Sequence, residues 1–301
     1  IQTKAVILAT EGHQGLWSKP SDGSGTGSAL AISAGIDLKG MEITPRHPLT
    51  IRDCGIHIPL DVLGSGGRIR RENGDDVGPE EALEGEPCVL DLRQMDADAK
   101  VWFSQTSMRI MDRLGIDISK DVIPLSPGIA YTTGGAPSDA QGRVVFQGHT
   151  AEGLPAELWH TGLYAAGRSA HTGVHGSNAL PGNLLLDDLV SGKAAGEHAS
   201  KWATGIRFGG NNQIEEALKR ESDRVSSIME GDGIAVAKFY SKLTSAISSG
   251  SSNEGSLAEV RAIKDTGITL SDTSSVMNTE MAEALRLVGL ASVAESILTS
   301  G

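Results

Sequence analysis

Apolar residues first gather in a short run near the start of the chain. The run Lys4 to Thr10 (KAVILAT) is rich in apolar and β-branched residues and stops at a glycine-bearing stretch. A continuous apolar run of this length predicts a strand that is buried on both faces. A glycine-rich stretch then leads into Ser28 to Ala34, where small residues predict a helix that ends at Gly35. The first unit is therefore a strand, a glycine loop and a helix.

A second unit of the same kind begins at Gly162 to Gly167 (GLYAAG). The segment His171 to Gly176 (HTGVHG) follows it and predicts a loop. A helix is expected from Leu184 to Lys201, and Asn183 is well placed to act as its N-cap.

The stretch between the two units, Pro45 to Pro127, has an irregular pattern. It predicts a strand at Cys88 to Leu92 (CVLDL) and an amphipathic helix near Ala97 to Leu114. Its short basic cluster, Arg68, Arg70 and Arg71, has no aromatic residues among it and is interpreted as a solvated turn. The whole stretch is expected to form an inserted domain.

Helical spacing of apolar residues begins near Asn212. Three stripes predict helix faces packed into a core: Ile214, Ala217, Leu218, Val225, Ile228 and Met229; Ile234, Phe239, Leu243 and Ile247; and Met281, Ala284, Leu285, Val288 and Ile297. Asn278 is the predicted N-cap of the last helix. The serine-rich stretch Ser245 to Ser256 predicts a flexible connection between helices.

Together these elements predict an α/β domain that carries an inserted α+β domain and is followed by an all-α C-terminal domain. The α/β domain would comprise residues 1–44 and 127–201. The insertion would comprise residues 45–126, and the helical domain residues 202–301.

Composition and charge exclude several classes of function. The formal net charge of −12 argues against a nucleic-acid partner, because such proteins carry basic patches. The two cysteines, Cys54 and Cys88, cannot build a disulfide framework and are expected to be reduced and buried. No apolar run approaches the roughly 20 residues of a membrane span, and no signal-peptide pattern opens the chain. We expect a cytoplasmic protein.

Metal-dependent or hydrolytic chemistry is a weaker alternative. His171 and His175 lie four residues apart, but Gly173 between them disfavours a ligand-bearing helix, and no glutamate follows the first histidine as in zincins. A Gly-x-Ser-x-Gly elbow is absent from the sequence. The histidines are interpreted as loop residues near a cofactor cleft.

Several motifs also occur in a characteristic order. VILAT with its glycine turn, a helix ending in AG, and MEITPRHPLT come first; LDLR and IPLSPGIAYTTGGAPSD follow; GLYAAGRSAHTGVHGSNALPGNLLLDDLV comes next. The final NTEMAEALRLVGLASVAESIL is similar to the start of a C-terminal helical domain. In order and spacing these segments resemble the flavoprotein family of succinate dehydrogenase, fumarate reductase and L-aspartate oxidase, and they correspond to its C-terminal half.

The resemblance implies an FAD-dependent oxidoreductase, with FAD lying between a dinucleotide-binding domain and a capping domain. Backbone N–H groups at the start of the helix near Leu184 would suit a flavin that becomes anionic when reduced. The turn from Thr10 to Gly12 and the loop from Gly25 to Gly27 would approach the ribose and adenine side. The implied cofactor-binding residues are Thr10, Gly12, Gly25, Thr26, Gly27, Gly167, Arg168, Asn183, Leu184 and Leu185.

The sequence departs from the family where the dicarboxylate is handled. His47, the histidine of the family's HPT motif, is kept as a candidate substrate-binding residue. The other groups that hold and protonate the dicarboxylate are replaced or missing, as at Pro59, Leu60, Ala130 and Ala179 and in the arginine-free segment 75–87. We therefore expect a substrate other than succinate or fumarate. The alternative is a non-catalytic relative that serves as a binding or assembly module.

Departures also occur among the implied flavin contacts. Arg168 replaces a glutamate, Thr26 an aspartate and Glu11 a glycine. The family's Gly-x-Gly-x-x-Gly turn has no counterpart in this sequence, which we interpret as part of a longer, truncated protein. The resemblance further implies a small-molecule substrate or electron donor, and an iron–sulfur partner subunit through which the protein would be peripheral to a membrane.

Overall fold

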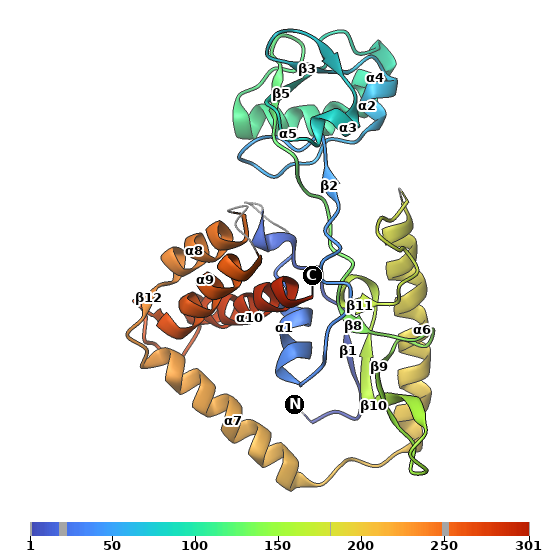
Figure 1. The fold of residues 1–301 in the computed structure, drawn as a ribbon, viewed down its shortest axis with the longest axis vertical. Helices are drawn as coiled ribbons and strands as arrows, with labels where there is room; N and C mark the ends of the chain where they lie inside the picture. The colour runs from blue at the N-terminus through green and yellow to red at the C-terminus, as the bar shows by residue number, and fades with distance from the viewer. Residues whose placement is uncertain (1, 18–22, 181, 249–252, 301) are drawn as a thin grey trace. The chain divides into compact units, whose positions relative to one another are not determined.

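The computed structural model describes residues 2–17, 23–180, 182–248 and 253–300 (Figure 1). The chain packs as two compact units. Unit 1 is formed by the described residues of Ile1–Leu16, Asp22–Thr44 and Thr132–Gly301, and unit 2 by those of Trp17–Ser21 and Pro45–Tyr131. The predicted division into an FAD-binding, a capping and a helical domain stays a prediction.

Unit 1 is built on a three-stranded sheet in the order β1-β10-β9. Strand β1 (Val6–Leu8) pairs in parallel with β10 (Pro155–Ala165), and β9 (Arg143–His149) pairs with β10 in the antiparallel direction. The prediction that the first strand is buried on both faces was wrong. Val6 is 45% and Ile7 39% exposed, because β1 is the edge strand of this sheet and only Leu8 is covered.

The helix that follows the glycine loop is α1 (Thr26–Ser33), with Ala34 as its C-cap. Gly35 follows with a left-handed φ of 79°, which agrees with the prediction that this glycine closes the helix. A short 3₁₀ turn, η1 (Gln14–Leu16), precedes it. Helix α1 packs closely against α10 (Thr279–Thr299), since a Cβ on Gly289 of α10 would lie 2.7 Å from the Ala29 Cβ.

Helix α6 (Asn183–Gly205) covers β10 (Figure 1). It buries Ala195 and Ala199 against the fully buried Tyr164. The prediction of Asn183 as N-cap was wrong by one position. Gly182 occupies the cap with a left-handed φ of 82°, which glycine adopts without steric cost, so Asn183 is already helical. Between β10 and α6 lie the 3₁₀ turn η2 (Gly167–Ser169) and β11 (Ala170–His171), which pairs in parallel with β8 (Ala136–Pro137).

The C-terminal part of unit 1 contains α7 (Asn211–Met229), α8 (Val236–Ser248), α9 (Asn253–Thr266) and α10, with a two-residue parallel pair formed by β12 (Ile234–Ala235) and β13 (Ile268–Thr269). The predicted cap of α10 is confirmed, because Asn278 Oδ1 accepts a hydrogen bond from Met281 N at 2.7 Å. Residues 249–252 of the predicted serine-rich connection lie outside the described residues, and α8 and α9 extend into its two ends.

The predicted core stripes had different outcomes. Phe239 and Leu243 of α8, and Met281 and Ala284 of α10, are buried as predicted. The stripe on α7 was predicted wrongly, since Leu218 is 64% exposed and the other members are only half-buried. Helical spacing shows that residues share a face, but it does not show what covers that face.

Unit 2 contains a four-stranded antiparallel sheet in the order β4-β3-β5-β6. The strands are β3 (Arg68–Arg71), β4 (Asp76–Val77), β5 (Cys88–Asp91) and β6 (Ile123–Leu125), and a second pair is formed by β2 (Arg46–His47) and β7 (Gly128–Ile129). The helices are α2 (Asp61–Gly64), α3 (Pro79–Ala82), α4 (Ala97–Trp102) and α5 (Ser104–Leu114).

Two predictions for unit 2 were confirmed and two need correction. The strand at Cys88 is present, and both Cys54 and Cys88 are buried free thiols. The single helix predicted from Ala97 to Leu114 is broken into α4 and α5 at Phe103, whose side chain is 1% exposed in the core.

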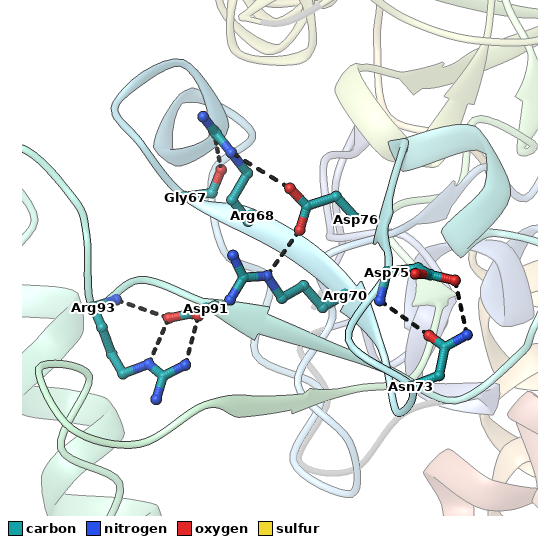
Figure 2. A network of polar contacts seen from close by, with 8 residues as sticks. All are labelled: Gly67, Arg68, Arg70, Asn73, Asp75, Asp76, Asp91 and Arg93. Carbon is teal, nitrogen blue, oxygen red and sulfur yellow. Dashed lines mark hydrogen bonds and ion pairs between the residues drawn. The ribbon is translucent and has the colours of Figure 1, made fainter.

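The basic cluster at Arg68, Arg70 and Arg71 is strand β3, not a solvated turn. Figure 2 shows why charged residues are stable there. The side chain of Ile69 is buried in the core, while Arg70 bridges two carboxylates, with Nε 2.8 Å from Asp76 Oδ1 and Nη1 2.7 Å from Asp91 Oδ2. The Arg93 guanidinium donates two hydrogen bonds to the Asp91 carboxylate. Arg70 on β3 is thus linked to β4 through Asp76 and to β5 through Asp91.

Asp91 is the most buried carboxylate of this network, with its side chain 6% exposed. Hydrogen bonds from the Arg93 side chain lower the pKa of Asp91 from 3.8 to about 2, against the opposing effect of burial. Because the folded-state pKa lies below the ordinary value, the ionised carboxylate stabilises the fold above about pH 4, and this contribution is lost as the pH falls through 2.

We predict that Asp91→Asn removes this pH-dependent stability. Its unfolding free energy near pH 7 should be lower than that of the wild type by about 2 kcal/mol, and it should fall less steeply between pH 4 and 2. Chemical unfolding followed across this pH range measures both quantities. Asp98→Asn, at an exposed position in the first turn of α4, is the matched control and should retain the wild-type profile. Identical pH profiles for Asp91→Asn and the wild type would contradict the assignment.

Candidate functional site

An open groove lies beyond the carboxyl ends of the parallel strands β1 and β10. In α/β sheets, ligands bind in the crevice outside the carboxyl ends of parallel strands. The groove has a volume of about 350 Å³. Its lining comes from the residues that follow the two strands and from α6: Ala9, Thr10, Glu11, Ala166, Gly167, Arg168, Asp188 and Gly192. Three predicted cofactor-binding residues, Thr10, Gly167 and Arg168, therefore share this groove.

Ser169 connects the two glycine units through Thr10, which lines this groove. Its hydroxyl donates to the Thr10 carbonyl oxygen at 2.9 Å and accepts from Thr10 N at 2.8 Å. The Ser169 and Thr10 hydroxyl oxygens are 3.0 Å apart, and Thr10 Oγ1 accepts from Gly27 N at 3.0 Å. These contacts hold the end of β1, the start of α1 and the η2 turn together, although Thr10 and Ser169 are 159 residues apart in sequence.

The predicted glycines beside these contacts leave no room for side chains. A Cβ on Gly27 would clash with Thr10 Oγ1 and would lie 2.7 Å from Ser169 Oγ. A Cβ on Gly12 would clash with Thr132 Oγ1, and Gly25 has a left-handed φ of 69°. Gly25 N also donates to the Gly12 carbonyl oxygen at 3.1 Å. The main chain of both loops therefore reaches positions that only glycine allows.

Glu11 anchors the loop in front of α1. Its carboxylate accepts hydrogen bonds from the hydroxyl and from the backbone N of Ser24, the latter at 3.0 Å. Ser24 Oγ is also 2.7 Å from Thr26 Oγ1, so the predicted residue Thr26 joins the same chain of contacts. The Ser24 hydroxyl is the main reason why the pKa of Glu11 lies below its ordinary value. Glu11, which was expected to replace a glycine of the family, therefore holds this loop through Ser24.

A second, narrow hollow of about 20 Å³ adjoins the start of α6. Gly167 and Arg168 line both this hollow and the groove. The histidines interpreted as loop residues near a cleft lie here: His171 Nδ1 is 3.1 Å from the Thr133 carbonyl oxygen, and His175 Nε2 is 3.3 Å from Asp187 Oδ2. The carbonyl oxygen can only accept, so His171 donates from Nδ1.

The three predicted residues at the start of α6 have different surroundings. Leu184 lines the narrow hollow, Asn183 is half-buried, and the Leu185 side chain is 66% exposed. The first N–H groups of a helix have no partner within the helix and can contact a ligand. Any contribution from Leu185 would therefore come from its backbone.

His47 lies in unit 2, on β2, whereas the predicted cofactor-binding residues lie in unit 1. His47 Nδ1 accepts from Leu49 N at 3.1 Å, so the neutral ring carries its proton on Nε2. The His57 ring centroid is 5.3 Å away, and His57 Nδ1 is 2.9 Å from Thr50 Oγ1. Burial, with a smaller effect of His57, lowers the pKa of His47 to about 4. His47 is therefore neutral near pH 7.

Sequence reasoning missed Ser169, Asp188 and His57. No local pattern marks them, because each acts on a residue brought near by the fold. The GLYAAG motif could have drawn attention to Ser169, which follows it by two residues. Within the described ranges, no set of three or more histidine, cysteine, aspartate or glutamate side chains is arranged to hold a metal ion.

No helix in the described part of the chain has the length and apolarity needed to cross a bilayer.

The family model for the FAD binding domain matches residues 1–185. The succinate dehydrogenase flavoprotein subunit of Rickettsia conorii is 27% identical over 95% of this chain and 54% of its own length. The fumarate reductase flavoprotein subunit of Escherichia coli is 25% identical over 100% of this chain and 56% of its own. The L-aspartate oxidase of Mycobacterium leprae is 30% identical over 75% of this chain and 47% of its own. The chain thus spans about half the length of these curated relatives.

Solved structures show the same fold. An E. coli quinol fumarate reductase chain superposes with a TM-score of 0.84 at 22% identity, covering 98% of this chain and 57% of that one. Mycobacterium smegmatis Sdh1 superposes with a TM-score of 0.78 at 23% identity, covering 98% and 54%. The predicted resemblance is confirmed, and the predicted cofactor, FAD, is the one for which the matching family is named. This chain belongs to the FAD-binding flavoprotein family that includes succinate dehydrogenase and fumarate reductase flavoprotein subunits and L-aspartate oxidase.

Proposed function

We propose that this protein is an FAD-dependent oxidoreductase that acts on a substrate other than succinate or fumarate. The observation that carries the proposal is the glycine-lined groove at the carboxyl ends of β1 and β10, held in shape by Ser169 and Thr10. The related flavoprotein subunits and oxidase support the reaction class.

The residues of unit 1 fit the cofactor in two respects. Gly12 and Gly27 bring the main chain to positions that a side chain would block, which lets a flat or extended ligand lie against the backbone. The α6 N-terminus offers N–H groups and a partial positive charge beside the narrow hollow. When bound, FAD would supply the transfer of electrons to or from substrate. Under this proposal Thr10, Gly12, Gly25, Thr26, Gly27, Gly167, Arg168, Asn183, Leu184 and Leu185 hold it.

The proposed change of substrate rests on the loss of charged groups. The resemblance places Ala130 and Ala179 where the family has a histidine and an arginine. It places Pro59 and Leu60 where the family has a threonine and a glutamate. His47, neutral near pH 7, can donate one hydrogen bond from Nε2 but offers no positive charge to a second carboxylate. Each lost charge-assisted hydrogen bond costs about 1.5–3 kcal/mol of binding, so a dicarboxylate would bind weakly.

The same losses support a second candidate, a non-catalytic relative that binds or assembles with other proteins. Two relatives are named as flavoprotein subunits, which also supports a partner subunit for this protein, and an iron–sulfur protein is our proposal for it. Reduction of bound flavin by an electron donor distinguishes an enzyme from a binding module.

We predict that the purified chain retains flavin absorbance after it is incubated with FAD and the unbound FAD is removed. Dithionite or a nicotinamide donor should bleach the bound flavin, whereas succinate should not, because the dicarboxylate groups are replaced. Visible absorption spectroscopy under anaerobic conditions measures both. A chain that retains no flavin contradicts the proposed cofactor site. Bleaching by succinate at a rate typical of enzymes, about 1 s⁻¹ or faster, contradicts the proposed substrate.

We predict that Gly27→Ala weakens flavin retention by at least about tenfold. The new Cβ would clash with Thr10 Oγ1 and approach Ser169 Oγ, two short side chains that cannot move aside without breaking their hydrogen bonds. Overpacking of this kind costs about 1–3 kcal/mol. Fluorescence titration with FAD and thermal unfolding measure the two effects.

Gly196→Ala is the matched control for this change. Gly196 lies within α6, and a Cβ there would meet no atom within 4 Å. Alanine at this position should leave flavin retention unchanged and raise stability by up to about 1 kcal/mol. Equal flavin affinity in Gly27→Ala and Gly196→Ala would contradict the proposal that the contacts among Thr10, Ser169 and Gly27 shape the cofactor site.

A further inference from the structure

Arg168 is the cationic side chain in the lining of the groove. It is half-buried in the η2 turn, and its Nε is buried without a hydrogen-bond partner among the described residues. A buried N–H left without a partner costs about 1–3 kcal/mol, and more when the group is charged. Arg168 also lines the neighbouring narrow hollow, so this residue borders both spaces.

The carboxylates nearby are engaged elsewhere or lie against the main chain. Glu11 lines the groove, but one of its oxygens accepts both hydrogen bonds from Ser24. Asp187 Oδ2 lies 3.3 Å from His175 Nε2. Asp188 lies over Gly167, where a Cβ would clash with Asp188 Oδ1. These contacts leave the guanidinium of Arg168 available to a ligand.

We propose that Arg168 is a phosphate-binding residue and that the groove takes the phosphate or diphosphate part of a ligand. Guanidinium groups match phosphate oxygens with two parallel hydrogen bonds, and these charge-assisted bonds are among the strongest in proteins. The site lies at the carboxyl ends of two parallel strands, where α/β proteins place phosphorylated ligands. Gly167 and Gly192, which have no side chains, also line the groove.

The charge balance of the groove makes this assignment sensitive to single substitutions. Without Arg168, the ionisable residues in the described lining are Glu11 and Asp188, and both are acidic. A phosphate would then meet only repulsion from charged side chains. Conversely, removal of the Asp188 charge should strengthen phosphate binding, since the repulsion opposes Arg168. The two variants therefore shift affinity in opposite directions.

The inference deepens the proposed function, because FAD contains a diphosphate, but it is tested separately. Isothermal titration of the full chain would use inorganic pyrophosphate, ADP and FAD as phosphate-bearing probes. Adenosine and riboflavin are the phosphate-free probes. The variants are Arg168→Gln, Arg168→Lys and Asp188→Asn, and the control is Arg220→Gln, at an exposed arginine on α7.

We expect Arg168→Gln to weaken binding of pyrophosphate and ADP by at least about tenfold, the loss of one charge-assisted interaction. Arg168→Lys should retain part of the affinity, because it keeps the charge but loses the planar fork. Asp188→Asn should bind a few times more tightly, and Arg220→Gln should match the wild type. Adenosine and riboflavin should show no dependence on Arg168. Circular dichroism confirms that each variant is folded.

Three results would overturn the inference: no binding of pyrophosphate or ADP by the wild-type chain, equal binding by Arg168→Gln, or an equal loss for adenosine and riboflavin. Binding of pyrophosphate alone would identify the groove as an anion site, whereas tighter binding of ADP would identify a nucleotide site; both support the assignment to Arg168.

If pyrophosphate binding depends on Arg168 but FAD does not bind, the inference stands and the proposed cofactor site fails. If FAD binds but neither FAD nor pyrophosphate depends on Arg168, the cofactor proposal stands and the inference fails.

Discussion

The hydroxyl of Ser169 is the contact on which the candidate site depends. It accepts from Thr10 N and donates to the Thr10 carbonyl oxygen, so it satisfies both backbone groups of the residue where the chain leaves β1. Thr10 Oγ1 in turn accepts a hydrogen bond from Gly27 N. Three segments that belong to different parts of the chain thereby meet at one point. A hydroxyl can do this because it is a donor and an acceptor at once.

Charge is distributed differently in the two units. In unit 2 each arginine of β3 is near a carboxylate, and the resulting network stabilises a sheet that would otherwise place like charges side by side. In the groove of unit 1, Arg168 lines the wall with two acidic residues and keeps a buried nitrogen without a partner. Arginines paired with carboxylates indicate a structural role, whereas an arginine that lines a groove and keeps an unused N–H donor is suited to binding an anion.

The substitutions that separate this chain from its relatives fall into two groups with different physical consequences. By the resemblance, Glu11 and Thr26 stand at positions expected near the cofactor, and both are hydrogen-bonded through Ser24 into the loop before α1. Ala130 and Ala179 stand at positions expected to hold the dicarboxylate, and neither side chain can form a hydrogen bond. Under the proposal, the loop before α1 keeps its shape through other contacts, while no charged side chain replaces the dicarboxylate groups at those two positions. This contrast is the basis for proposing a retained cofactor with a changed substrate.

The sequence by itself determined the family, because several motifs follow one another in a characteristic order. It also determined the glycine turns, the glycine that closes α1 and the cap at Asn278, because these depend on neighbours within a few positions. It could not determine the strand at Arg68 to Arg71, where ion pairs with Asp76 and Asp91 offset the cost of charge, nor the exposure of Val6 and Leu218. The role of Ser169 likewise appeared only in the tertiary structure. A hydrogen bond between residues 159 positions apart leaves no periodic signal in the sequence, since only the folded backbone brings its two ends together.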